Sequence, residues 1–322
     1  MAEPILDPGQ PIVDPHHHLY VRDGVHYLAE KFSADIRSGH NIRATVFVQA
    51  RAFYRDHGPE ALRPVGETEF AARVADEAET SVGPRLCAAI VGYADLLQGD
   101  AVRPVLEAHL AAGKRRFRGV RHILAWDPDA RLLNPAYPTR EDMTASSPFR
   151  QGFAHLAALG LSFDAWLLFP QIPRLVALAR SYPDTPIVLN HCGGIIGVGG
   201  YAEHRREVFL QWRDTMATLA TCNNVSVKIG GLGMAISGFG FERSEHGPSS
   251  AELAAAWQPW VHTCIELFGV NRCMFESNFP ADKPSYSYAA GWNAMKILAA
   301  ELTKEERHAL FYGSAAQFYR LD

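Results

Sequence analysis

The feature that most constrains this chain is the alternation of short apolar runs with amphipathic segments. Eight runs rich in β-branched and aromatic residues end in polar residues or glycine, at 11–16, 44–50, 86–93, 117–124, 161–169, 186–194, 224–232 and 272–280. Segments with apolar residues at three- and four-residue spacing lie between most of them, at 69–81, 102–113, 149–160, 172–183, 206–220 and 255–269. Strands that alternate with helices form a parallel sheet, because each helix returns the chain to the same end of the sheet.

Eight strand–helix units are the number found in a closed (β/α)8 TIM barrel, which is an α/β fold. An open doubly wound sheet is the alternative. No Pro/Ser-rich linker or change of composition divides the 322 residues, so we expect residues 1–322 to form a single barrel domain. Hydrophobic residues make up 48% of the chain and charged residues 20%, which provides the apolar material for a large core.

Charge and cysteine content restrict the partners of the protein. The formal net charge is −4, so no basic field is available to hold a nucleic acid or an anionic membrane surface. No run reaches the roughly 18 apolar residues of a membrane-spanning helix, and residues 1–10 do not read as a signal peptide. The five cysteines form no CxxC pair, which fits a reducing, cytoplasmic setting. We expect a small-molecule substrate, and a homo-oligomer is left open.

Three consecutive histidines follow the first apolar run. Side chains alternate along a strand, so His16 and His18 share one face and His17 faces the opposite way. A third histidine, His191, ends the sixth run. In a barrel the ends of the strands carry the functional residues, and three imidazoles suit a divalent metal such as zinc. Histidines bonded to one another or to backbone carbonyls are the structural alternative.

Several motifs together resemble the amidohydrolase superfamily, in the branch that contains 2-pyrone-4,6-dicarboxylate lactonase and fuconolactonase. They are the DxHxH of Asp14, His16 and His18, the LNHCGG at 189–194 and the RCMFESNFP at 272–280. The resemblance extends from residue 12 to about residue 314 and includes FRGVRHIL, FDAWLLFPQ and NVSVKIGGLG in the expected order. It implies a (β/α)8 barrel that opens lactones or related ester and amide bonds with activated water. It also implies that His16, His18 and His191 bind one divalent metal, with zinc favoured; metal-independent catalysis is the alternative, because the branch includes members without a metal.

The chain departs from the family at the eighth run. Where the family has the aspartate of a GSDWP-like motif as general base, this chain has Asn278, and an amide accepts no proton at neutral pH. Glu276 stands two residues earlier on the same face, and Asp282 lies four residues later on the loop. Either carboxylate could serve as the base. For Glu276, a buried ion pair with Lys228 is the structural alternative.

The candidate substrate contacts are Arg121, His122, Gln171 and Lys228. A guanidinium at the end of the fourth run can grip a carboxylate or stabilise negative charge on a carbonyl oxygen, although it could also pair with an acidic neighbour in the barrel wall. The glycine-rich segments 193–204 and 236–248 are long enough to act as lids. The sequence therefore predicts a hydrolase that opens a small carboxylated lactone. The alternatives are a metal-dependent decarboxylase of an aromatic or unsaturated acid, and a non-catalytic ligand-binding barrel.

Overall fold

The protein is a (β/α)8 barrel. The computed structural model describes residues 3–22, 24–80 and 83–321. Eight strands pair in parallel in chain order. They are β1 (Pro11–His17), β4 (Asn41–Val48), β5 (Arg85–Gly92), β6 (Phe117–Ile123), β7 (Ser162–Trp166), β8 (Ile187–Leu189), β9 (Val225–Ile229) and β10 (Cys273–Phe275). The barrel closes between its first and last strands, where His18 N donates to Phe279 O and Asn278 N donates to His16 O. The predicted fold is confirmed.

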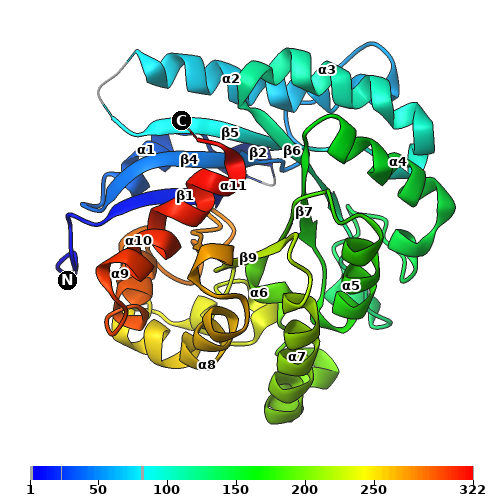
Figure 1. Cartoon of the computed structure of the whole chain (residues 1–322). Coiled ribbons are helices and arrows are strands. Elements are labelled where there is room, and N and C mark those ends of the chain that lie inside the picture. Colours follow the sequence, from blue (N-terminus) through cyan, green and yellow to red (C-terminus); the bar gives the residue numbers. More distant parts are fainter. Residues whose placement is uncertain (1–2, 23, 81–82, 322) are drawn as a thin grey trace.

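Helices follow the strands, and most of them pack around the outside of the barrel (Figure 1). The described helices are α1 (Ala29–Ile36), α2 (Val65–Glu79), α3 (Arg103–Gly113), α4 (Ser147–Ala158), α5 (Ile172–Ser181), α6 (His191–Gly194), α7 (Arg205–Ala220), α8 (Ser250–Phe268), α9 (Tyr288–Leu298), α10 (Lys304–His308) and α11 (Ser314–Tyr319). The start of α8 shows how sequence sets a boundary: Ser249 Oγ accepts from Glu252 N, and Glu252 Oε2 accepts from Ser249 N. This capping box satisfies backbone donors that the first helical turn leaves unpaired.

Some elements differ from the sequence expectation. A short hairpin of β2 (Tyr20–Arg22) and β3 (Val25–Tyr27) follows the first strand, and the expectation did not include it. The sixth run ends its strand early, because His191 and Cys192 take positive φ angles of 56° and 50°. The eighth run likewise leaves the sheet after Phe275. Strand ends marked by such turns place polar side chains at the barrel mouth.

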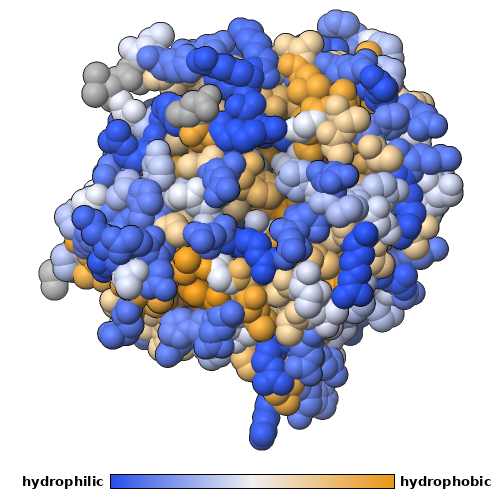
Figure 2. All heavy atoms as spheres, in the orientation of Figure 1, coloured by the Kyte–Doolittle hydropathy of each residue, from blue (hydrophilic) through white to orange (hydrophobic). Residues whose placement is uncertain are grey.

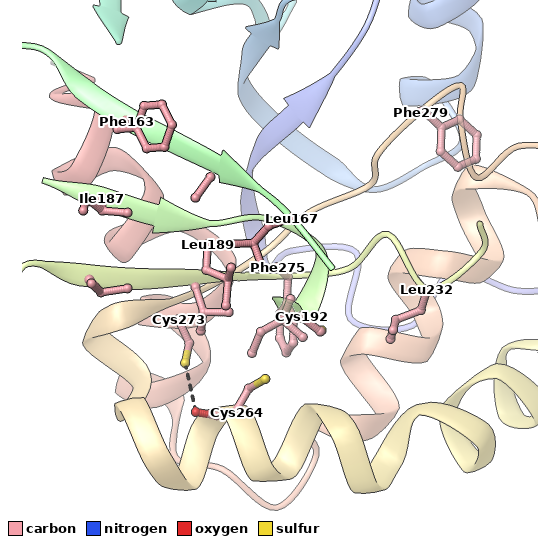
Figure 3. Packing of buried hydrophobic residues seen from close by; sticks show 14 of the residues in the cluster. Phe163, Leu167, Ile187, Leu189, Cys192, Leu232, Cys264, Cys273, Phe275 and Phe279 are labelled. Carbon is pink, nitrogen blue, oxygen red and sulfur yellow. Dashed lines mark hydrogen bonds between the residues drawn. The ribbon is translucent and has the colours of Figure 1, made fainter. Parts of the chain in front are cut away.

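Two apolar layers support the barrel. The larger fills the space between the strands and the surrounding helices. Figure 3 shows part of it, with Phe163, Ile187 and Leu189 on neighbouring strands and Cys273 beside Cys264 of α8. In the view of Figure 2, hydrophilic residues cover much of the outer surface and apolar residues show in separate groups between them. No helix among the described residues is long and apolar enough to cross a lipid bilayer.

The second layer lies inside the barrel. Small and β-branched side chains of β1, β4, β5 and β8 form it together with Met274 of β10. Ala315 and Tyr319 of the C-terminal helix α11 complete this cluster. The Tyr319 hydroxyl lies 2.9 Å from Asp164 Oδ2, inside the barrel. The interior of the barrel is therefore packed with side chains and is not an open channel, and the polar residues of the barrel mouth lie on top of this packing.

Candidate functional site

The histidines of the first strand divide as their alternation predicts. His16 and His18 face the same side, with their Nε2 atoms 3.3 Å apart. His17 points the other way, where its ring stacks on Phe32 at a centroid distance of 4.1 Å and bonds the Thr45 hydroxyl. His17 is therefore a wall residue, and the other two rings are directed into one site.

His191 completes a cluster of three imidazoles. Its ring centroid lies 4.5 Å from that of His16, because the positive φ at His191 turns the chain inward just after β8. The three rings are almost fully buried, with exposures of 0% for His16, 7% for His18 and 4% for His191. Burial lowers the pKa of each imidazole well below its ordinary value, so all three are neutral near pH 7.

Glu276 joins the histidines at the centre of the site. Its Oε1 lies 2.6 Å from His191 Nδ1 and accepts from the His191 backbone N–H at 3.1 Å. Its Oε2 lies 2.9 Å from His16 Nδ1 but has no hydrogen bond of good geometry. Burial raises the pKa of Glu276 to about 8, and the Lys228 ammonium opposes that increase. Potential ligand atoms of His16, His191 and Glu276 all lie within 4.8 Å of one another, which makes them a candidate metal site.

Contacts on the far side of each ring indicate which imidazole nitrogens carry lone pairs. The carbonyl of Val48 can only accept, so the 2.7 Å contact places the proton of His18 on Nδ1 and a lone pair on Nε2. Donors face both nitrogens of the His16 ring, with Arg121 Nη1 3.2 Å from Nε2 and Lys228 Nζ 3.3 Å from Nδ1. The lone pair of His18 Nε2 lies 3.3 Å from His16 Nε2, on the side of the ring that faces the cluster. Neutral imidazoles and a carboxylate with a free oxygen are a donor set that fits a divalent metal.

Lys228 lies below the histidines and is fully buried. The structural alternative predicted for Glu276, an ion pair with Lys228, is wrong. Lys228 Nζ instead lies 2.7 Å from Asp164 Oδ2 and also donates to Pro15 O. The register explains this choice: Lys228 is level with Met274 of β10, and Glu276 lies two residues closer to the barrel mouth. The Lys228–Asp164 pair, held from below by Tyr319, supports the floor of the site.

Asn278 and Asp282 form a separate network beside the cluster. Asn278 Nδ2 donates to Asp282 Oδ1 at 2.7 Å, and Asp282 Oδ2 accepts from Gly233 N at 3.0 Å and from the Tyr286 hydroxyl. Burial raises the pKa of Asp282 to about 7, and the hydrogen bond from Tyr286 opposes that increase. Of the two carboxylates predicted near the missing aspartate, the structure therefore brings Glu276 to the histidines and commits Asp282 to local hydrogen bonds.

The remaining predicted contacts lie around the cluster. Arg121 is in the cluster, and its Nη2 also donates to Gln49 O. His122 faces a small cavity beside the site and accepts from Leu96 N. The amide of Gln171 accepts from Trp126 N and donates to Leu124 O, so it holds the backbone after β6.

Loops cover the mouth of the barrel. Gly197 N donates to Ile236 O, which ties the two glycine-rich segments to each other. The Tyr201 hydroxyl donates to Asp127 Oδ2 at 2.7 Å and so fastens one of them to the loop after β6. The histidines are buried, and these contacts fasten the two segments that the sequence predicts as lids.

Sequence reasoning missed residues at the ends of two strands. Trp166 packs edge-on against His191, with a centroid distance of 4.8 Å. Gln49 and Arg51 directly follow β4 and line the cavity that His122 also faces. Their position in the sequence could have identified them, because residues just after a barrel strand lie at the barrel mouth.

Known proteins share both sequence and fold with this chain. The chain is 34% identical to the uncharacterized protein y4mH of Sinorhizobium fredii, over 96% of this chain and 98% of the relative. It is 28% identical to L-fucono-1,5-lactonase of Burkholderia ambifaria, over 84% and 88%. A zinc-bound amidohydrolase from Burkholderia multivorans has the same fold, with a TM-score of 0.73, 23% identity and coverage of 97% and 99%. So does 5-carboxyvanillate decarboxylase from Novosphingobium aromaticivorans, complexed with manganese, with a TM-score of 0.63, 12% identity and coverage of 98% and 97%.

The family model described as amidohydrolase matches residues 13–321, which is nearly the whole chain. This match confirms the resemblance predicted from the strand-end motifs. The chain belongs to the amidohydrolase family.

Proposed function

We propose that this amidohydrolase opens a small carboxylated lactone with water at the cluster of His16, His191 and Glu276. The observation that carries the proposal is the carboxylate of Glu276, which is buried, contacts two imidazoles and retains an oxygen without a good hydrogen bond. The similarity to a fuconolactonase favours a lactone as the substrate class.

Each residue has a distinct part in the proposed reaction. Glu276 accepts the proton of the attacking water in its ionised form, which predominates above its pKa of about 8, whereas the amide of Asn278 cannot accept a proton. Arg121, with its guanidinium beside His16, stabilises the negative charge that develops on the carbonyl oxygen. The covering loops exclude bulk water, which strengthens these electrostatic interactions.

We also propose that His16, His18 and His191 hold one divalent cation, with Glu276 beside it. Imidazole nitrogen suits zinc, and such a cation supplies Lewis acidity to a carbonyl and to a water molecule. Hydrolysis by Glu276 and Arg121 alone is the metal-independent alternative. Metal analysis of the purified protein, before and after chelation, decides between these two when hydrolysis is measured on the same samples.

The test of function is proton release from carboxylated lactones. Paraconate and coumalate, a saturated and an unsaturated carboxylated lactone, are incubated with the protein, and ring opening is measured with a pH indicator. The proposal expects turnover that His16→Ala abolishes and His17→Ala spares in the folded fraction, because only His16 faces the site. Absence of turnover on every carboxylated lactone tested contradicts the proposal.

A decarboxylase is the second candidate. The observation that favours it is Trp166, whose flat ring lies against His191 and could face an aromatic acid. The similarity to a decarboxylase is one of fold alone, so it supports this candidate only because a barrel of this fold can carry decarboxylation. Release of carbon dioxide from hydroxybenzoates, without acid release from lactones, supports this candidate over the first. The third candidate is a non-catalytic ligand-binding barrel, and Asn278→Asp tests it, because the family aspartate should restore hydrolysis to a barrel that has lost it.

A further inference from the structure

A small cavity of about 100 Å³ lies beside the histidine cluster, at the ends of β4, β5 and β6. Gln49, Arg51, Tyr93, His122 and Tyr137 contribute to its lining. Its volume fits a carboxylate group and the carbon that bears it, and is too small for a whole substrate. The chemistry of the lining therefore decides which group of a substrate it accepts.

Arg51 brings a positive charge to this cavity that no described carboxylate neutralises through a salt bridge. Its guanidinium carbon lies 5.6 Å from the ring centre of Tyr93 and 5.1 Å from that of Tyr137. Aromatic faces hold a cation in place without cancelling its charge. One nitrogen donates to the carbonyl of Ala136, which also leaves the charge intact.

Asp95 is the acidic residue in the cavity lining, and no salt bridge joins it to Arg51 among the described residues. Its Oδ1 accepts from Leu97 N at 3.0 Å and lies 3.9 Å from His122 Nδ1. The carboxylate thus caps the short helix that begins at Leu96. Arg51 remains available to an anion from outside the protein.

Gln49 provides a second, independent indication that this cavity binds an anion. Its side chain is fully buried, its Oε1 accepts from Arg51 N at 3.1 Å, and its Nε2 has no hydrogen-bond partner among the described residues. Buried donors are nearly always satisfied, so an orphaned amide nitrogen at a cavity indicates a missing acceptor. An amide donor beside a guanidinium selects an acceptor that carries negative charge.

The turn that presents these groups is held in place before any ligand arrives. Arg51 has a φ of 56°, a left-handed conformation that costs energy for a residue other than glycine. Glu67 maintains it from α2, because its Oε1 accepts from Ala50 N at 2.7 Å and from Ala52 N at 3.1 Å. Strain supported by a buried carboxylate is a mark of a preorganised binding site.

The backbone of the turn that carries Gln49 and Arg51 is bonded to the proposed reaction centre. Val48 O fixes the ring of His18, and Gln49 O accepts from Arg121, which contacts His16. The turn is therefore held to two residues of the histidine cluster, and a group bound at the turn can orient the rest of a small ring toward that cluster.

From these contacts we infer that the Gln49–Arg51 cavity is the subsite for the carboxylate of the substrate, and that Arg51 determines specificity for acidic lactones. The inference deepens the proposed function and rests on it for the identity of the ring. It assigns the acid group to Arg51 and leaves Arg121 for the carbonyl that reacts.

The test uses a ligand that cannot be hydrolysed, so that binding is measured apart from catalysis. The cyclopentanone isostere of paraconate keeps the carboxylate and carbonyl but has no ester bond, and its carboxamide is the neutral match. Both are titrated by calorimetry into the full-length protein and into Arg51→Met, Gln49→Glu and Arg213→Met. Gln49→Glu preserves the acceptor for Arg51 N and places a negative charge where the orphaned donor was. Arg213 is an exposed control on α7 paired with Asp214.

We expect the acid isostere to bind the native protein and Arg213→Met alike, at least tenfold more tightly than the carboxamide. Arg51→Met and Gln49→Glu should each weaken the acid at least tenfold and leave the carboxamide unchanged. Equal affinity of acid and carboxamide for the native protein, or undiminished acid binding in both folded variants, overturns the inference. If the acid binds as expected but no lactone is hydrolysed, the carboxylate subsite stands and the proposed hydrolase function fails.

Discussion

Replacing Glu276 by glutamine removes the proposed proton acceptor and one carboxylate of the candidate metal site. The amide oxygen can still accept from the His191 backbone N–H, and the side-chain volume is unchanged. The amide cannot take a proton from water. Glu276→Gln therefore separates the chemical role of the carboxylate from its contribution to packing.

The expected loss is large in rate and small in stability. A positioned general base contributes about 10²- to 10⁴-fold, which corresponds to about 3 to 5 kcal/mol of activation free energy. Because burial disfavours the ionised carboxylate and raises its pKa to about 8, the neutral amide regains in desolvation much of what it loses in hydrogen bonding. We expect the free energy of unfolding to change by about 1 kcal/mol or less.

The assay is kcat for lactone opening, with urea unfolding measured on the same preparations. Asp282→Asn is the matched control, since this carboxylate is equally buried but bonded to Asn278 and Tyr286. It should keep most of the activity, because the Asn278 amide can rotate to offer an acceptor to the new donor. Glu276→Gln with near-native kcat, or an equal loss from Asp282→Asn in folded protein, would refute the assignment of the base.

Three further outcomes follow from the contacts. Asp164→Asn leaves the buried Lys228 ammonium without its counter-charge and should reduce the free energy of unfolding by about 3 to 5 kcal/mol, measured by urea titration; a change below about 1 kcal/mol would contradict the pairing. Burial lowers the pKa of His109 to about 4, from about 6.5 in the unfolded chain. The free energy of unfolding should therefore be highest above pH 6.5 and should fall by about 3 kcal/mol as the pH drops to 4. His109→Gln should reduce that slope, and parallel curves for both proteins would show that another group causes it. Tyr201→Phe removes the bond to Asp127 and should speed amide exchange in the covering loop about fivefold, with exchange in the strands as the unchanged reference.

The barrel was predictable because its signals are local. Alternation of side chains along a strand placed His16 and His18 on one face and His17 on the other, and the structure confirms that division. The same rule correctly turned Glu276 toward the interior, where it meets His191. Periodicity in sequence reports the direction of a side chain relative to its own strand.

Partners across the barrel were not predictable in the same way. Lys228 reaches from β9 to Asp164 on β7, a choice that depends on the height of each residue in the closed barrel rather than on sequence spacing. Asn278 takes a φ of 54°, so alternation from Glu276 did not carry through to it. Arg51 was overlooked because its proposed role depends on a left-handed turn and on Tyr137, which lies far along the chain.

Ring opening in oxygen-18-labelled water tests the central proposal most directly. The native protein and Glu276→Gln are incubated with paraconate and coumalate, and the products are analysed by mass spectrometry. Hydrolysis at the histidine cluster predicts a product that has gained one water with a single labelled oxygen in its new carboxylate, formed by the native protein and not by folded Glu276→Gln. Unlabelled substrate recovered intact from the native protein, or a product that has lost carbon dioxide, would contradict it.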